Sequence, residues 1–230
     1  MLVCIEGMDG VGKTSIIDIL KKELDFKKYE KPIENLLNLD FSKCKDITYN
    51  VCSNYSKKVE AMYFLLGFMT VYEKSREENI IMDRGILSTY YFSNNNDSNF
   101  LFESFFENKI YPDLNIILYA DIEERIKRII SRNPDDEDLL KKRIYKNGYD
   151  KYFECISKYD LNSIIINNTN MTLEETANIC KRIIKIIITN QCSELLNILS
   201  IKNIELQKNI CYNEFESIVS NYEQEKIKKR

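Results

Sequence analysis

The sequence predicts an α/β fold, a three-layer sandwich in which helices flank both faces of a parallel sheet. Two observations lead to this prediction. Short apolar runs alternate along the chain with segments of helical periodicity, which is the order that a parallel sheet requires. The chain also has 230 residues, of which 44% are hydrophobic and 30% charged, a composition typical of a globular protein with a substantial core.

The first predicted elements are a strand, a glycine-rich loop and a helix. Residues 2–5 form a short apolar run with the character of a buried strand. After the loop, four apolar residues recur at helical spacing opposite a charged face. They are Ile16, Ile17, Leu20 and Leu24. Residues 59–73 are then apolar nearly all round, so we expect a helix buried against the sheet.

Three further apolar runs complete the predicted sheet. They are residues 79–82, 114–120 and 163–166. The second of these runs leads into a helix that we expect to begin near Asp121. After the third, Thr172 and Glu175 have the spacing of a capping box, which predicts the start of a last helix.

The chain is expected to divide near residue 190. Residues 1–190 hold all the predicted strands and form the main domain. Beyond about residue 190 the sequence indicates no further strand, and its apolar residues have helical spacing. We therefore expect residues 191–230 to form a helical C-terminal extension.

The composition excludes several classes of protein. The chain has no histidine, which excludes the usual serine and cysteine triads. Its seven cysteines are scattered, without a Cys-x-x-Cys pair, so we expect them to be reduced. No stretch approaches the roughly 20 apolar residues that span a bilayer, and the first 20 residues lack the unbroken apolar segment of a secretory signal. We expect a cytoplasmic protein without a membrane partner, and the net charge of -3 gives no general attraction to nucleic acid.

The loop at residues 7–14, GMDGVGKT, fits the pattern G-x-x-x-x-G-K-[ST] between a strand and a helix. Glycines let backbone N–H groups approach phosphate oxygens, the lysine reaches the β and γ phosphates, and the hydroxyl binds Mg²⁺. The loop therefore predicts a P-loop NTPase fold that binds ATP with Mg²⁺. The predicted ATP-binding residues are Gly7, Asp9, Gly10, Val11, Gly12, Lys13, Thr14 and Ser15.

Three segments carry a resemblance to a known family. Residues 6–14 read EGMDGVGKT, residues 83–84 read Asp-Arg and precede a Ser-Thr pair at 88–89, and residues 112–114 read Pro-Asp-Leu. Together they resemble the thymidylate kinases, which are P-loop nucleoside monophosphate kinases. The resemblance covers about residues 1–185.

The resemblance implies roles for the residues around the loop. Asp83 would support Mg²⁺ together with Thr14, and Arg84 would bridge the donor and acceptor phosphates, where it neutralises the charge on the transferred group. The implied catalytic residues are Lys13, Asp83, Arg84, Arg128 and Arg132. An ordinary surface ion pair remains the alternative for Asp83 and Arg84.

The resemblance also implies an acceptor site. Its residues would be Asp9, Phe64, Phe68, Arg84, Ser88, Thr89, Phe92 and Tyr149. Asp9 would lie near the acceptor sugar, with a turn-forming aspartate as the alternative. Ser88 and Thr89 would face the base or sugar, although a helix cap explains them equally well, and the neighbouring aromatic residues also fit a core.

A mobile lid is expected at about residues 131–148, because Pro134 and four acids interrupt a helical pattern flanked by basic residues. Gly10 occupies a loop position where some family members place an arginine, so a lid arginine becomes more important. Arg128 and Arg132 are the chosen residues, with Arg143 behind them. A solvated charged surface is the alternative interpretation.

Two departures from the family pattern leave alternatives open. Phe68 stands where family members carry an arginine that reads thymine, which affects base selectivity. Residues 31–34 read KPIE, similar to a motif of deoxynucleoside kinases, in which Glu30 or Glu34 would act as the base for a sugar hydroxyl. A nucleotide-binding regulatory protein without catalysis is the third hypothesis.

The predicted function is ATP-dependent phosphorylation of a pyrimidine deoxynucleoside monophosphate, above all of dTMP to dTDP. Its partners would be small-molecule nucleotides rather than nucleic acid. Since family members are commonly homodimers, the resemblance also implies a homodimer.

Overall fold

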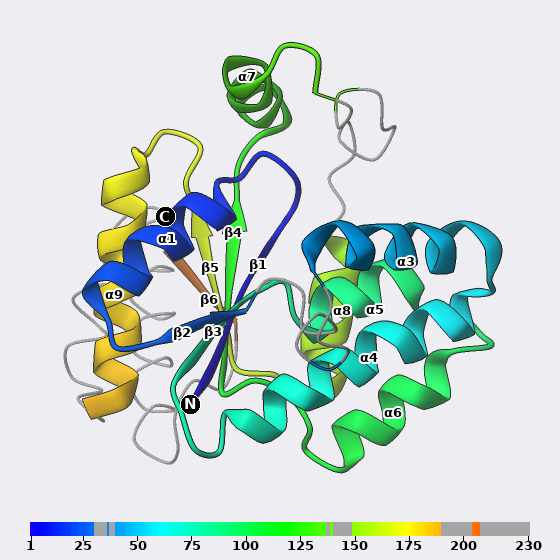
Figure 1. Ribbon diagram of the computed structural model, residues 1–230. Coiled ribbons are helices and arrows are strands. Elements are labelled where there is room, and N and C mark those ends of the chain that lie inside the picture. The colour runs from blue at the N-terminus through cyan, green and yellow to red at the C-terminus, as the bar shows by residue number, and fades with distance from the viewer. Residues whose placement is uncertain (30–35, 37–39, 137–138, 140–148, 190–203, 208–230) are drawn as a thin grey trace, which may run out of the picture.

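The centre of the computed structural model, which describes residues 1–29, 36, 40–136, 139, 149–189 and 204–207, is a six-stranded sheet (Figure 1). Its strands are β1 (Leu2–Gly7), β2 (Lys27–Tyr29), β3 (Ile80–Asp83), β4 (Leu114–Tyr119), β5 (Ser163–Asn167) and β6 (Ile204–Gln207). Their order is β2-β3-β1-β4-β5-β6, with β1 to β5 parallel and β6 antiparallel to β5. The parallel sheet predicted from the alternating runs is therefore confirmed.

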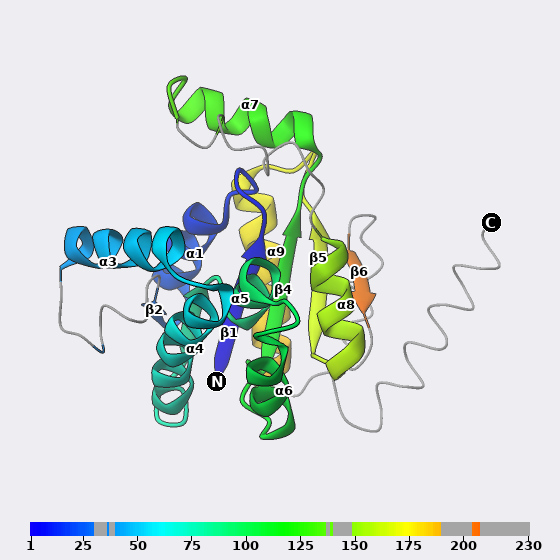
Figure 2. The ribbon, with the colours of Figure 1, turned by 90° about the vertical axis from the view of Figure 1, so that its right-hand side faces the viewer.

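Helices cover both faces of this sheet. The structure describes helices α1 (Lys13–Glu23), α3 (Phe41–Asn54), α4 (Lys57–Lys74), α5 (Ile86–Ser93), α6 (Asn99–Glu107), α7 (Ile122–Arg132), α8 (Asp150–Tyr159) and α9 (Leu173–Thr189). Helices α1 and α9 lie on one face, and α4, α5, α6 and α8 on the other (Figure 1). Figure 2 shows α7 standing beyond the edge of the sheet, above the loop that follows β1.

Two hydrophobic cores form because alternate residues of a strand point to opposite faces. Val3 and Ile5 pack in the core beneath α1 and α9. Leu2 and Cys4 pack in the core beneath α4, α5, α6 and α8. By the same period, Glu6 of β1 points to the α5 side of the sheet.

The structure departs from the predicted elements at two places. β2 has only three residues, two of them lysines, and therefore lacks the apolar run by which the other strands were found. The expectation that no strand follows residue 190 is wrong for Ile204–Gln207, which pair with β5. Residues 191–203 and 208–230 of the predicted extension lie outside the described residues. The expected burial of α4 against the sheet is confirmed by Leu65 and Phe68, which lie in the second core, whereas Val59, Met62 and Leu66 are 39%, 54% and 51% exposed.

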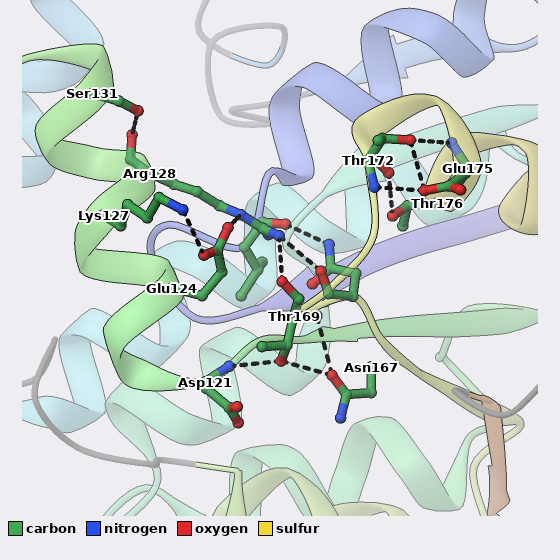
Figure 3. Close-up of polar contacts among 12 residues, drawn as sticks. Asp121, Glu124, Lys127, Arg128, Ser131, Asn167, Thr169, Thr172, Glu175 and Thr176 are labelled. Atoms are coloured by element: carbon green, nitrogen blue, oxygen red, sulfur yellow. Dashed lines mark hydrogen bonds and ion pairs between the residues drawn. The ribbon is translucent and has the colours of Figure 1, made fainter.

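Two predicted helix boundaries are confirmed. The amide of Glu175 donates to Oγ1 of Thr172 at 3.1 Å, and the amide of Thr172 donates to Oε2 of Glu175 at 2.8 Å (Figure 3). This reciprocal pair is the capping box of α9. Helix α7 ends at Arg132, two residues before Pro134, as the interrupted pattern predicts. Within the described ranges, none of the helices combines the length and the apolarity that crossing a membrane requires.

Candidate active site

The glycine-rich loop and the Asp83–Arg84 motif meet at the carboxyl ends of two neighbouring strands. β1 and β3 are neighbouring parallel strands, so their carboxyl ends lie side by side. The glycine-rich loop follows β1, and Arg84 follows β3. The amide of Arg84 donates to the carbonyl of Ile5 at 3.1 Å, which extends the ladder of the two strands to the start of the loop.

The loop has the backbone conformation of a phosphate cradle. Gly7, Gly10 and Gly12 have φ values of 141°, 88° and 91°, a range that favours glycine over other residues. Gly12 precedes α1, so the unpaired N–H groups of that helix point into the loop. A Cβ on Gly10 would lie 2.7 Å from the backbone oxygen of Arg125, and this contact with α7 excludes any side chain at position 10.

Lys13 lies inside the loop and is 7% exposed. Its Nζ donates to the carbonyl oxygens of Gly7 and Met8, both at 3.0 Å. Burial, followed by the nearby charge of Arg84, lowers the pKa of Lys13 to about 7, against the opposing effects of Asp83, Asp9 and Glu6. The ligand-free lysine therefore titrates near neutral pH.

Thr14 and Asp83, the two predicted metal residues, lie against each other. Oγ1 of Thr14 donates to Oδ2 of Asp83 at 2.8 Å. A hydroxyl and a carboxylate are hard oxygen ligands of the kind that Mg²⁺ prefers, and Mg²⁺ usually keeps several waters and the phosphates of the substrate as its other ligands. The donor set therefore fits Mg²⁺ held with a nucleotide, and the described residues include no cluster of three or more His, Cys, Asp or Glu side chains for a metal.

Arg84 extends its guanidinium to the beginning of the loop. Nη1 donates to the carbonyl of Gly7 at 3.2 Å, and Nη2 forms an ion pair with Asp9. The ring of Phe92 lies 5.8 Å from the guanidinium carbon. The φ of Arg84 is 65°, an uncommon value for a non-glycine residue and one that clusters at functional sites. The sequence-predicted residues Asp9, Arg84 and Phe92 thus converge.

Glu6 is a residue of this site that the sequence prediction missed. It is fully buried, and its Oε1 accepts from the amides of Gly85 and Ser88 at 2.8 and 3.3 Å. Its Oε2 accepts from Oγ of Ser88 at 2.5 Å. Burial raises the pKa of Glu6, while these hydrogen bonds and the charge of Arg84 act in the opposite direction. A carboxylate in an apolar strand was the available signal.

Gly85 allows this contact to form. A Cβ on Gly85 would lie 2.5 Å from Sγ of Cys4, so only glycine lets the start of α5 come this close to β1. The close approach places the first turn of α5 over Glu6, where an anion is favourable at a helix N-terminus.

Several residues predicted to bind the acceptor form hydrogen bonds or ring contacts inside the protein. Tyr149 is 2% exposed; its hydroxyl donates to the carbonyl of Leu118 at 2.8 Å and accepts from the amide of Met8 at 3.3 Å. Oγ1 of Thr89 donates to the carbonyl of Gly85 at 3.2 Å. Phe68 is fully buried and stacks on Tyr72. Tyr149 thus connects the phosphate loop, through the amide of Met8, to the end of β4. The assignment of these residues to the acceptor site stays a prediction.

The other predicted ring and loop residues differ in exposure. Phe64 is half-buried and packs edge-on against Tyr63. Val11 lies in the core beneath α1, so it contributes to the loop through its backbone. Ser15 is exposed in the first turn of α1.

The predicted lid arginines both have anionic or carbonyl partners. In Figure 3, Arg128 reaches from α7 to the loop between β5 and α9, where Nη2 donates to the carbonyls of Asn168 at 2.7 Å and Thr169 at 3.4 Å. Its Nε donates to Glu124 at 2.8 Å. Arg132 pairs with Asp136. Their catalytic role stays a prediction, and Arg143 lies outside the described residues.

The loop between β5 and α9 contacts the phosphate loop, which the sequence did not reveal. Nδ2 of Asn168 donates to the carbonyl of Val11 at 2.9 Å, and the amide of Asp121 donates to Oγ1 of Thr169 at 3.0 Å. The phosphate loop is therefore bonded to this loop, which in turn is bonded to Asp121, the residue before α7. Polar asparagine and threonine side chains after a strand gave only a turn signal.

Comparison with known proteins identifies the family to which this arrangement belongs. The family model of thymidylate kinase matches residues 5–179, a span that holds the phosphate loop, Arg84 and the loop after β5. The chain belongs to the thymidylate kinase family. As a member, it is a phosphotransferase of the nucleoside monophosphate kinase type, acting on nucleotides with ATP as the phosphoryl donor.

Two relatives carry the name of this family. A protein of Methanocaldococcus jannaschii named probable thymidylate kinase is 27% identical over 182 residues, which cover 77% of this chain and 92% of the relative. A thymidylate kinase of Nautilia profundicola is 26% identical over 178 residues, 73% of this chain and 88% of its own. The resemblance drawn from the three motifs is thereby confirmed.

Solved structures share the fold. The thymidylate kinase of Candida albicans has a TM-score of 0.58 at 20% identity, covering 83% of this chain and 92% of its own. A deoxyadenosine kinase of M. mycoides has a TM-score of 0.57 at 18% identity, with coverage of 80% and 99%. At these identities the two structures establish the shared fold.

We expect ATP binding to this thymidylate kinase family member to depend on the charge of Lys13. Because its pKa is about 7 without ligand and bound phosphates favour the ammonium form, binding above pH 7 requires proton uptake, and affinity should fall by roughly tenfold per pH unit above that value. Calorimetric titration with ATP from pH 6.5 to 8.5, in buffers of different ionisation enthalpy, measures the affinity and the number of protons taken up.

The matched control is Lys13→Arg, whose side chain stays charged over this range. Its titrations report the pH dependence that belongs to ATP itself. Equal slopes for the wild type and Lys13→Arg, without excess proton uptake in the wild type, would contradict the lowered pKa of Lys13.

Proposed function

We propose that the protein transfers the γ-phosphoryl group of ATP to the 5′-phosphate of a pyrimidine deoxynucleoside monophosphate, above all dTMP. The observation that carries this proposal is the guanidinium of Arg84, which lies against Gly7 and Asp9 at the start of the phosphate loop. A cation beside the loop is suited to hold a second anion next to the donor phosphates. Membership of the thymidylate kinase family supports the same acceptor class.

In the proposed reaction an oxygen of the acceptor phosphate attacks the γ-phosphorus. The bond to the β,γ-bridging oxygen breaks, and ADP leaves with that electron pair. The loop amides and Lys13 hold the donor phosphates, and Arg84 neutralises charge on the transferred group. Thr14 and Asp83 would hold Mg²⁺, which supplies charge neutralisation between the β and γ phosphates when bound.

The chemistry of a phosphate acceptor fits the residues of this site. An acceptor phosphate is already anionic and requires positive charge, whereas a sugar hydroxyl requires a carboxylate base. Glu6, the buried carboxylate on the α5 side, is occupied by three hydrogen bonds from α5. Glu30 and Glu34, the bases of the deoxynucleoside kinase alternative, lie outside the described residues.

An ADP-release assay with dTMP, dUMP, dCMP, dGMP, thymidine and deoxycytidine tests the proposal. We expect Mg²⁺-dependent turnover with the pyrimidine monophosphates, highest with dTMP, and loss of turnover when Mg²⁺ is chelated. Activity with nucleosides alone would favour the deoxynucleoside kinase hypothesis. ATP binding without turnover on any acceptor would favour the regulatory hypothesis.

We expect Arg84→Ala to lower kcat by about 10³-fold or more, because it removes a charged donor from the transferred group. Lys13→Ala should abolish transfer. Arg76→Ala is the matched control, since Arg76 is an exposed arginine paired with Glu73 at the end of α4, and it should keep wild-type kinetics. If Arg84→Ala lowered kcat as little as Arg76→Ala does, the proposed role of Arg84 would be contradicted.

We also propose that the protein is a cytoplasmic homodimer. Support for an interface comes from α4, where Val59, Met62 and Leu66 form an exposed apolar stripe at helical spacing. Sedimentation at micromolar concentration should give twice the chain mass, and Met62→Glu should shift it towards the monomer. A wild-type monomer under these conditions would reject the dimer.

A further inference from the structure

We propose that Tyr152 of α8 is a positioning residue for Arg84, acting through the hydroxyl of Ser88. The inference rests on the proposed function, in which Arg84 contacts the transferred phosphoryl group. Tyr152 belongs neither to the phosphate loop nor to the motifs that define the family resemblance. Its contribution is to hold the acceptor of an Arg84 hydrogen bond in one orientation.

Ser88 is the junction of this arrangement. Its Oγ lies 2.5 Å from Oε2 of Glu6, 2.9 Å from the hydroxyl of Tyr152 and 3.4 Å from Nη1 of Arg84. Glu6 and Tyr152 are fully buried, and Ser88 is 4% exposed. Water therefore has little access to replace Glu6 or Tyr152 as partners of Ser88. Arg84 is partly exposed, and its hydrogen bond is the longest of the three.

The direction of each hydrogen bond follows from the groups involved. Arg84 can only donate, and the carboxylate of Glu6 only accepts. Ser88 has one proton, which it gives to Glu6, and two lone pairs. One lone pair accepts from Arg84, so the other must accept from Tyr152. Burial and the neighbouring Glu6 raise the pKa of Tyr152, which keeps the tyrosine proton available for this bond.

Without the tyrosine donor, the Ser88 hydroxyl keeps Glu6 as a partner but loses the second of the two buried groups that fix its rotation. The oxygen can then shift relative to Nη1 of Arg84, whose guanidinium keeps its polar contacts with Gly7 and Asp9. The guanidinium ends a long, flexible side chain, and small displacements of such a group from its reacting geometry reduce the rate. Tyr152 therefore acts on turnover through the position of Arg84.

Tyr90 provides a matched control on the same pair of helices. Its hydroxyl donates from α5 to Oε1 of Glu154 on α8 at 2.9 Å, and the residue is 1% exposed. Tyr152 makes the corresponding bond in the other direction, from α8 to Ser88 on α5. Both hydroxyls join α5 to α8, but the Tyr152 hydroxyl also reaches the acceptor of Arg84.

The test compares Tyr152→Phe with Tyr90→Phe, using the acceptor identified in the ADP-release assay. We expect Tyr152→Phe to lower kcat on the order of tenfold, as loss of one buried hydrogen bond allows, with an unchanged Kd for ATP. Tyr90→Phe should stay within about twofold of the wild type. In an Arg84→Ala background, Tyr152→Phe should cause no further decrease, because the residue through which it acts is gone.

A second readout requires no turnover. In ¹⁵N-arginine NMR spectra, rotation of the Arg84 guanidinium, assigned with Arg84→Lys, should be faster in Tyr152→Phe than in the wild type and unchanged in Tyr90→Phe. Equal kinetic effects of the two tyrosine variants, a full further decrease in the Arg84→Ala background, or unchanged guanidinium rotation would each overturn the inference. A wild type that transfers to no acceptor would instead remove the proposed function, and the NMR comparison would still decide the position of Arg84.

Discussion

The buried carboxylate of Glu6 is the interaction on which the arrangement of the site depends. It joins the end of β1 to the first turn of α5 through three hydrogen bonds, and Arg84 lies in the short connection between β3 and that turn. Because a buried carboxylate without partners is strongly unfavourable, the first turn of α5 has little freedom to move away from β1. The phosphate loop and Arg84 therefore keep a fixed relation to each other before any nucleotide binds.

Support for the site comes from both layers of helices. On one side, Asn168 of the β5–α9 loop holds the carbonyl of Val11. On the other, Tyr149 at the start of α8 holds the amide of Met8. Val11 and Met8 anchor the loop in the two hydrophobic cores, and glycine geometry and these side-chain hydrogen bonds fix its conformation between them. Such support is what a preorganised electrostatic site requires.

The fold and the centre of the site could be predicted because they depend on local patterns. The glycine spacing identifies the loop with Lys13 and Thr14, and the ends of two parallel strands bring Asp83 beside them. The roles of Glu6 and Tyr152 could not be predicted, since their partner Ser88 is 82 and 64 residues away in the sequence. Periodicity also missed β2, whose lysines carry no apolar signal, and it could not show which face of α4 lies outside the core.

The pairing of β6 with β5 affects how this chain can be shortened. β5 has β4 on one side and β6 on the other, so its backbone donors and acceptors are used in both directions along Ser163–Ile166. A truncation that removes Ile204–Gln207 would make β5, with its run of three isoleucines, an exposed edge strand of the sheet. An unpaired edge strand of this apolar composition can pair with strands of other molecules, which leads to aggregation.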